Sequence, residues 1–240
     1  MSDTTNLPTP ARALAIGAHP DDAEFGVGGT LRKWSRDGCE GFILVLTDGA
    51  KGTWDAAADP RELVKARQEE QRKAAEVLGL ADVFFAGHVD GELEYGMSLR
   101  EEVCGWIRRI RPDVVIGHDP WRRYMWHPDH RAAGWAAVDG VVAARDHLFF
   151  PGQEWGNHRP SALLLWAADD PDHREDITTE FEAKLEALLC HASQGVSTMR
   201  DAQASTEKAA EFRAHLEQWN AAMGGPVGFT FGEAFRRMTP

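Results

Sequence analysis

Short apolar runs alternate with longer amphipathic segments along the first two thirds of the chain. The runs cover residues 13–18, 42–47, 83–86, 114–117 and 162–167. Each run is apolar nearly throughout, as expected of a strand that is covered on both faces. The pattern therefore predicts a parallel sheet whose strands are buried between helices.

Helical periodicity fills the intervals between these runs. We expect helices over residues 61–78, 99–110 and 130–145, and another that begins at Thr30. Gly38, Gly79 and the Arg111-Pro112 pair follow these segments and are typical helix stops. Strands that alternate with crossover helices predict an α/β fold, a three-layer α/β/α sandwich with a mostly parallel, Rossmann-like sheet.

The C-terminal third has a different pattern. Helices are expected over residues 178–191 and 206–221, followed by a Gly-rich end, and residues 168–176 are interpreted as a solvated acidic loop. No Pro-rich or Ser-rich linker marks a second domain. We therefore expect one domain over residues 1–240, with a core over about 12–195 and a helical, Gly-rich tail over 196–240.

The composition narrows the classes of function. Of 240 residues, 26 are Lys or Arg and 38 are Asp or Glu, which gives a formal net charge of −12. Nucleic acids and anionic membranes bind basic surfaces, so neither is an expected partner. The N-terminus has no basic and apolar leader, and the longest apolar runs are far shorter than a membrane span. These features predict a cytoplasmic protein and leave a small-molecule substrate open.

Two polar clusters interrupt the regular pattern. Residues 17–24 (GAHPDDAE) follow the first predicted strand, and residues 127–131 (HPDHR) follow the fourth. In the strand order 3-2-1-4-5 of a doubly wound sheet, the first and fourth strands are neighbours and ligands bind beyond their carboxyl ends. We therefore expect the two clusters to face each other across one crevice, with His118 at its border.

The residue types of these clusters fit a catalytic zinc site. Two imidazoles and one carboxylate leave a fourth position open for water, and zinc lowers the pKa of that water to ~7. Asp21 and Asp22 are adjacent, so in an extended loop one binds metal while the other faces the water as a general base. Each cluster alone also fits a plain alternative, because HPDD suits a turn and HPDH suits a helix start. Their occurrence after two strands of one sheet favours the metal site.

AHPDD at residues 18–22 and HPDH at residues 127–130 are together the signatures of one family. Through them the sequence resembles the PIG-L / LmbE-like family of zinc-dependent N-deacetylases, whose members include deacetylases of N-acetylglucosaminyl-inositol and of the bacillithiol and mycothiol pathways. The resemblance covers roughly residues 12–195. Weaker supporting matches are Thr47-Asp48-Gly49, Lys51-Gly52, Arg67-Gln68-Glu69-Glu70, Leu78-Gly79 and residues 111–115.

The resemblance implies a role for each residue of the two clusters. The zinc ligands would be His19, Asp22 and His130, with Fe²⁺ as the alternative metal. Asp21 would be the general base that activates water and then passes the proton to the departing amine. His127 would stabilise the oxyanion together with the metal. Asp129 would orient His127.

Two residues outside the clusters are also assigned by the resemblance. Arg67 and Asp90 match positions that hold sugar hydroxyls in family members. Arg67 equally fits an ion pair on the helix surface with Glu70 or Glu62, and Asp90 fits a turn. The sequence departs from the family pattern at Met125, where some members have a catalytic tyrosine, and residues 121–126 (WRRYMW) form either a substrate lid or a packed surface loop.

The function that the resemblance implies is hydrolysis of an N-acyl group, expected to be acetyl, from an amino sugar or small glycoside. One alternative is a metal-dependent amidase that acts on a larger amide conjugate. Another is a non-catalytic carbohydrate-binding protein of the same fold. The expected partner is a small N-acetylated sugar, and a homo-oligomer is compatible with the resemblance.

Overall fold

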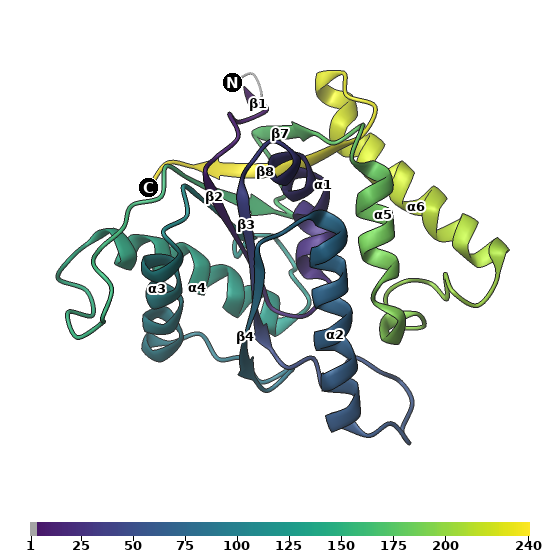
Figure 1. The fold of residues 1–240 in the computed structure, drawn as a ribbon, viewed down its shortest axis with the longest axis horizontal. Helices are drawn as coiled ribbons and strands as arrows, with labels where there is room; N and C mark the ends of the chain where they lie inside the picture. The colour runs from purple at the N-terminus through teal and green to yellow at the C-terminus, as the bar shows by residue number, and fades with distance from the viewer. Residues whose placement is uncertain (1–3) are drawn as a thin grey trace.

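The computed structural model describes residues 4–240, which form one mixed sheet covered by helices on both faces (Figure 1). The strands are β1 (Thr4–Thr5), β2 (Arg12–Gly17), β3 (Glu40–Thr47), β4 (Asp82–His88), β5 (Val114–His118), β6 (Ala162–Trp166), β7 (His173–Asp176) and β8 (Gly232–Met238). The α-helices are α1 (Asp22–Arg36), α2 (Pro60–Leu78), α3 (Met97–Ile110), α4 (Pro128–Arg145), α5 (Phe181–Leu189) and α6 (Thr206–Gly224). Two 3₁₀ turns, η1 (Ala192–Gln194) and η2 (Gly225–Val227), follow α5 and α6.

The sheet confirms the strand order expected from the sequence. Its order is β1-β7-β8-β6-β5-β2-β3-β4, and β2 to β6 pair in parallel. These five strands are the predicted ones, and their order is the predicted 3-2-1-4-5. Strand β8 runs antiparallel between β6 and β7. The predicted α/β class with a mostly parallel sheet is therefore confirmed.

Alternate residues of the central strands pack on opposite faces of the sheet. Leu14 and Ile16 of β2 belong to the core under α3 and α4, whereas Ala13 and Ala15 belong to the core under α1. This is the period of two that an extended chain imposes. Figure 1 shows α3 and α4 on one side of the sheet and α1, α2, α5 and α6 on the other.

Helix α1 begins at Asp22, eight residues before the predicted start at Thr30. Glycines in its first half lower the helix propensity, so the sequence did not predict this part of the helix. They are required by close packing, because a Cβ on Gly26 would lie 2.6 Å from the Trp166 ring and a Cβ on Gly29 would lie 2.7 Å from Ile177. The helix therefore starts inside the first polar cluster.

Two strands of the C-terminal third were missed. Residues 168–176 are not wholly a solvated loop, since 173–176 form β7, and the Gly-rich end contains β8. Their charged residues are buried in pairs. Glu175 accepts hydrogen bonds from Lys33 Nζ at 2.6 Å and contacts His173 at 2.8 Å, and Glu233 accepts from Lys184 Nζ at 2.6 Å. Charged residues usually indicate an exposed segment, so the sequence did not predict these two strands.

Start and stop signals in the sequence match most helix ends. Asp59 caps α2 by accepting a hydrogen bond of 2.8 Å from Arg61 N, and Pro60 takes the first position of that helix. Gly79 ends it in the left-handed conformation, with φ of 72°. Within residues 4–240, no helix combines the length and the apolar character that a membrane crossing requires.

Candidate metal centre

The two polar clusters meet at the carboxyl ends of β2 and β5. His19 follows β2, and His130 lies in the first turn of α4, which follows β5. Because β2 and β5 are paired neighbours, His19 and His130 come together although they are 111 residues apart in the sequence. Nδ1 of His19 lies 3.2 Å from Nε2 of His130. The prediction that topology joins the clusters is confirmed.

Three residues of these clusters bring potential ligand atoms to distances that suit one metal ion. Besides the His19–His130 contact, His130 Nε2 lies 3.3 Å from Asp22 Oδ1, and His19 Nδ1 lies 3.6 Å from Asp22 Oδ2. In a tetrahedral zinc site with bonds of ~2.0–2.2 Å, neighbouring ligand atoms are roughly 3.3–3.6 Å apart. His19, Asp22 and His130 thus fit the metal expected from the sequence.

Other histidines and carboxylates surround this trio. The described residues contain three overlapping groups whose ligand atoms lie within 4.8 Å of one another: His19/His127/His130, His19/Asp90/His127/Asp129 and Asp22/His118/His130. Each of the three groups contains at least one of His19, Asp22 and His130. This donor set of imidazole and carboxylate suits zinc or another divalent transition metal.

His19 is held by carboxylates on the side away from His130. Its Nε2 lies 3.1 Å from Asp90 Oδ1 and 3.1 Å from Asp129 Oδ2. In the singly protonated ring that binds a metal, the proton is therefore on Nε2, and the Nδ1 lone pair faces the candidate metal position. Burial opposes a charge on His19, but its bonds to Asp129, Asp22 and Asp90 outweigh burial and raise the pKa of His19 to about 12. The carboxylates thus stabilise positive charge where a metal cation would bind.

Asp129 contacts a different histidine from the expected one. Its carboxylate meets His19, and it also accepts hydrogen bonds from Gly91 N at 2.7 Å and Leu93 N at 3.2 Å. Its contact with His127 is made by the Asp129 backbone, whose N–H donates to His127 Nδ1 at 3.3 Å. The prediction that the Asp129 carboxylate orients His127 is therefore replaced by an orientation of His19.

His127 is the N-cap of α4, and that role sets its tautomer. Because Nδ1 accepts the Asp129 N–H, Nε2 carries the proton of the neutral ring. Burial, with the neighbouring His19 and His130, lowers the pKa of His127. The ring lies edge-on to His19 at a centroid distance of 4.5 Å. His127 therefore brings a neutral N–H donor beside the candidate metal ligands.

Asp22 is oriented by two donors. Its Oδ2 accepts a hydrogen bond of 2.8 Å from His19 N and lies 3.1 Å from Nε2 of His118. Burial would raise the pKa of Asp22, but His130 and His118 outweigh burial and hold the pKa well below its usual range. Oδ2 is thus occupied by donors, and Oδ1 faces His130 at the candidate metal position.

Asp21 is buried beside this position in a strained conformation. It caps α1 with φ of 93°, a left-handed geometry that costs a non-glycine residue roughly 1–3 kcal/mol. Its N–H donates to Gln71 Oε1 at 3.0 Å, and its Oδ2 lies 3.6 Å from Arg67 Nη2. Burial raises the pKa of Asp21 to about 6, although Arg67 and His191 oppose that shift.

Arg67 lies inside the protein and not on the helix surface. Its Nη2 donates to Pro20 O at 2.8 Å and its Nη1 donates to Gly49 O at 3.0 Å, so the alternative of a surface ion pair with Glu62 or Glu70 is wrong. The guanidinium fills the space above Gly52, where a Cβ would lie 2.1 Å from Nη1. Asp90 is equally buried and pairs with His19.

Two further buried histidines lie near the two polar clusters. His118 was placed at the border of the crevice, but it contacts Asp22 directly. His191 is fully buried, and its Nε2 lies 3.6 Å from Oε2 of Glu24. Neither lies in a ligand motif, so only the position of His118 after a strand signalled it.

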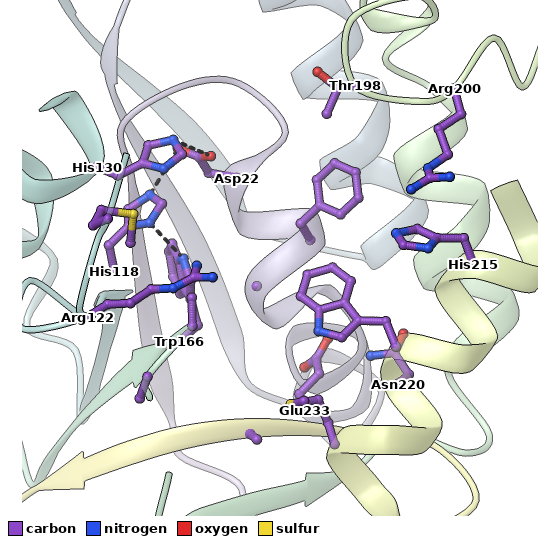
Figure 2. Close-up of a pocket in the computed structure, with 18 residues that line it drawn as sticks. Asp22, His118, Arg122, His130, Trp166, Thr198, Arg200, His215, Asn220 and Glu233 are labelled. Atoms are coloured by element: carbon purple, nitrogen blue, oxygen red, sulfur yellow. Dashed lines mark hydrogen bonds and ion pairs between the residues drawn. The ribbon is translucent and has the colours of Figure 1, made fainter. Parts of the chain in front are cut away.

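Residues 121–126 lie beside the cavity in part. Met125 is buried, whereas Tyr124 and Trp126 are exposed over more than nine tenths of their surface. The cavity beside Asp22 and His130 has a volume of about 440 Å³, and Arg122 and Met125 contribute to its lining (Figure 2). The two most exposed aromatic residues of this segment do not line it.

Comparisons with known proteins agree on one family. Residues 14–141 match the model of the family described as PIG-L, GlcNAc-PI de-N-acetylase. A diacetylchitobiose deacetylase of Thermococcus kodakarensis is 36% identical over 186 residues, which cover 76% of this chain and 70% of that protein. A 4-oxalmesaconate hydratase of Pseudomonas putida is 28% identical over 204 residues, 79% of this chain and 76% of that protein. The structure of N,N'-diacetylchitobiose deacetylase from Pyrococcus horikoshii superposes with a TM-score of 0.87 at 30% identity, over 96% of this chain and 84% of that one.

Proposed function

The chain belongs to the PIG-L family of de-N-acetylases, and from this premise we propose that it is a metal-dependent hydrolase that removes the acetyl group from a small N-acetylated amino sugar. The observation that carries the proposal is the convergence of His19, Asp22 and His130, whose ring nitrogens and carboxylate oxygens approach to 3.2–3.6 Å, next to the buried carboxylate of Asp21. The 36% identical diacetylchitobiose deacetylase supports an N-acetylated sugar as the substrate class.

Nδ1 of His19, Oδ1 of Asp22 and Nε2 of His130 would hold the metal, which is zinc or Fe²⁺ in this proposal. When bound, such a metal acts as a Lewis acid and lowers the pKa of a coordinated water to ~7. Asp90 and Asp129 keep His19 in place, and His118 keeps Asp22 in place, through the contacts described above.

Asp21 is the general base of the proposed reaction. Its carboxylate takes a proton from the water that attacks the acetyl carbonyl carbon, and it then gives this proton to the nitrogen as the C–N bond breaks. Acetate and a free amine are the products. Arg67 and Gln71 position Asp21, because both contact it and both are buried.

His127 stabilises the negative charge that develops on the carbonyl oxygen. As a neutral ring protonated at Nε2, it donates a hydrogen bond to this oxygen without itself changing protonation. The roles of Arg67 and Asp90 as contacts for sugar hydroxyls stay predictions. In the absence of substrate each is engaged by protein groups, Arg67 by Pro20 O and Asp90 by His19.

The test is product analysis with the zinc-loaded protein and a panel of N-acetylglucosamine, N,N'-diacetylchitobiose and N-acetylglucosaminides. We expect equal amounts of acetate and primary amine, and loss of both when the metal is chelated. A hydratase like the Pseudomonas putida relative adds water to a double bond and releases no acetate. A carbohydrate-binding protein would bind the sugars and leave them intact, and an amidase for larger conjugates would leave the acetyl groups in place.

A further inference from the structure

Asp21 caps helix α1 through its backbone alone. Its side chain makes no hydrogen bond to the helix, so the helix does not engage the carboxylate. In a capping box, the glutamate three residues after the cap accepts the N–H of the cap residue. Glu24 has that position in α1, but the Asp21 N–H donates to Gln71 Oε1 at 3.0 Å instead. The start of α1 is therefore held by a side chain of α2.

Gln71 stands between Asp21 and Glu24. While its Oε1 accepts the Asp21 N–H, its Nε2 donates to Glu24 Oε1 at 2.5 Å, and both side chains are buried. The bond to Glu24 fixes which end of the amide faces Asp21. A flipped amide would oppose two donors at Asp21 and two acceptors at Glu24. The Glu24 carboxylate thus determines that Gln71 presents its acceptor to the Asp21 N–H.

His191 faces the second oxygen of the Glu24 carboxylate. Oε2 of Glu24 lies 3.6 Å from Nε2 of His191, and neither atom has a hydrogen-bond partner within residues 4–240. Both side chains are fully buried. Burial opposes a charge on His191, but the nearby carboxylates, Glu24 foremost, outweigh burial and raise the pKa of His191. A buried carboxylate needs a compensating partner, and His191 provides one for Glu24.

The segment that carries His191 is fastened to α2. Ser193, in the turn η1 that follows His191, donates to Glu70 from its N–H at 2.8 Å and from its hydroxyl at 2.6 Å. Glu70 is next to Gln71 in α2, and α5, which leads into this segment, lies beside α1 and α2 (Figure 1). His191 lies outside residues 14–141, the part of the chain that matches the family model. The C-terminal part of the chain therefore contributes to the surroundings of Asp21.

We propose that His191 is a positioning residue for Asp21. Acting through Glu24 and Gln71, it holds the backbone of Asp21 in the left-handed conformation that keeps the carboxylate beside the candidate metal position. This conformation, with φ of 93°, is strained for a residue that has a side chain, so it needs bonds that hold it. The inference rests on the proposed role of Asp21 as the general base, and it adds a residue that belongs to neither polar cluster.

Two amide substitutions separate the roles of the two ring nitrogens of His191. The Gln side chain can place an N–H near the position of Nε2, which faces Glu24, whereas the shorter Asn reaches only the position of Nδ1. We expect His191→Asn to lower kcat for acetate release from N,N'-diacetylchitobiose at least about tenfold, because Glu24 loses its partner and Gln71 can turn away. His191→Gln should keep kcat within about threefold of the wild type.

KM and zinc content should stay at their wild-type values in both variants. Wild-type kcat in His191→Asn would overturn the inference, and so would an equal loss in His191→Asn and His191→Gln. Loss of zinc would overturn it as well, because His191 would then act on the metal ligands and not on Asp21.

A double-mutant cycle tests whether the effect passes through Gln71. In Gln71→Leu the connection from Glu24 to Asp21 is absent, so the addition of His191→Asn should change kcat by less than about twofold. A structural role that is independent of Gln71 would multiply the two losses and would contradict the inference. If His191→Asn does not fold, His191→Leu replaces it in every measurement, because leucine also lacks a donor.

His173→Asn is the matched control. His173 is also fully buried and also faces a buried glutamate, since its Nε2 lies 2.8 Å from Oε1 of Glu175. It lies in β7, which three strands separate from β2. The substitution should lower the free energy of unfolding and leave kcat within about twofold at a temperature at which the variant is folded.

Crystal structures of the wild type and His191→Asn give a readout that is independent of activity. We expect the Asp21 N–H to bond Gln71 in the wild type and to lose this bond in the variant, with Asp21 leaving the left-handed region. An unchanged Asp21 and Gln71 in the variant would overturn the inference. If the wild type releases no acetate but the structures differ as expected, the deacetylase proposal fails and the positioning role of His191 stands.

Discussion

The indole Nε1 of Trp166 donates a hydrogen bond of 3.0 Å to Nδ1 of His118. An indole N–H is only a donor, so His118 must accept at Nδ1 and carry its proton on Nε2. That proton points at Oδ2 of Asp22, 3.1 Å away. Burial lowers the pKa of His118 to about 4, which keeps the ring neutral and this arrangement intact at neutral pH. Trp166, at the end of β6, thus orients the candidate metal ligand Asp22 through His118.

Trp166→Phe should weaken metal binding without removing a ligand. Loss of the indole donor frees His118 to change tautomer, and Asp22 then loses one of the two donors on Oδ2. We expect zinc affinity to fall about 10- to 100-fold, as for other residues that orient metal ligands. Competition with a chromophoric chelator measures the change.

Trp34→Phe is the control for this experiment. Trp34 is also buried, but its Nε1 has no hydrogen-bond partner among residues 4–240. The substitution removes an equal volume and an unpaired N–H, so zinc affinity should not change. A similar loss of affinity in both variants would mean that the Trp166–His118 bond does not govern Asp22.

His130→Ala should lose the metal. The variant removes one of three proposed ligands, and His118 cannot replace it because Trp166 holds its Nδ1 and Asp22 its Nε2. Inductively coupled plasma analysis after dialysis should find less than about a tenth of the wild-type zinc content. His147→Ala, at an exposed histidine, should keep it. Full zinc occupancy in His130→Ala would contradict the assigned ligand set.

Arg67→Lys should reduce turnover and leave metal content unchanged. A lysine keeps the charge but cannot donate to Pro20 O and Gly49 O while also facing Asp21. We expect kcat to fall about 10- to 100-fold, because misplacement of a catalytic group by roughly 1 Å has effects of this size. If KM rose and kcat stayed at the wild-type value, Arg67 would act on the sugar and not on Asp21.

Glu175→Gln should destabilise the fold at neutral pH and flatten its pH dependence. Burial alone would raise the pKa of Glu175, but hydrogen bonding to His173 and the charge of Lys33 outweigh it and lower the pKa. A lowered pKa means that the carboxylate contributes stability above its unfolded value of 4.5 and that this contribution is lost as the pH falls below it. Breaking this buried pair should cost about 3 kcal/mol at pH 7.

Urea denaturation between pH 7 and pH 3.5 measures this effect. The free energy of unfolding should fall more steeply with acid in the wild type than in Glu175→Gln, and the two should converge at low pH. Glu62→Gln, in an exposed pair with Lys65, serves as the control and should match the wild type at every pH. Parallel curves for Glu175→Gln and the wild type would contradict the linkage.

The sequence predicted the three residues that converge at the candidate metal centre because they lie in two short motifs after recognisable strands. Apolar runs specified β2 to β6, and the strand order followed from the rules for parallel sheets. The sequence did not predict β7 and β8, because Glu175 and Glu233 are charges buried against lysines that lie far away in the sequence. It also paired the Asp129 carboxylate with His127 and not with His19. The contact with His19 joins residues that are far apart in the sequence, so no motif spacing indicates it.

The central claim is that Asp21 performs base catalysis beside a metal that other residues hold. Its most direct test is to measure zinc content and the rate of acetate release from N,N'-diacetylchitobiose for the wild type, Asp21→Asn and the control Asp139→Asn, which alters a remote ion pair with Arg100. The account predicts that all three bind equal zinc, that Asp139→Asn releases acetate at nearly the wild-type rate, and that Asp21→Asn loses at least about 100-fold in kcat. Wild-type turnover by zinc-loaded Asp21→Asn would contradict it.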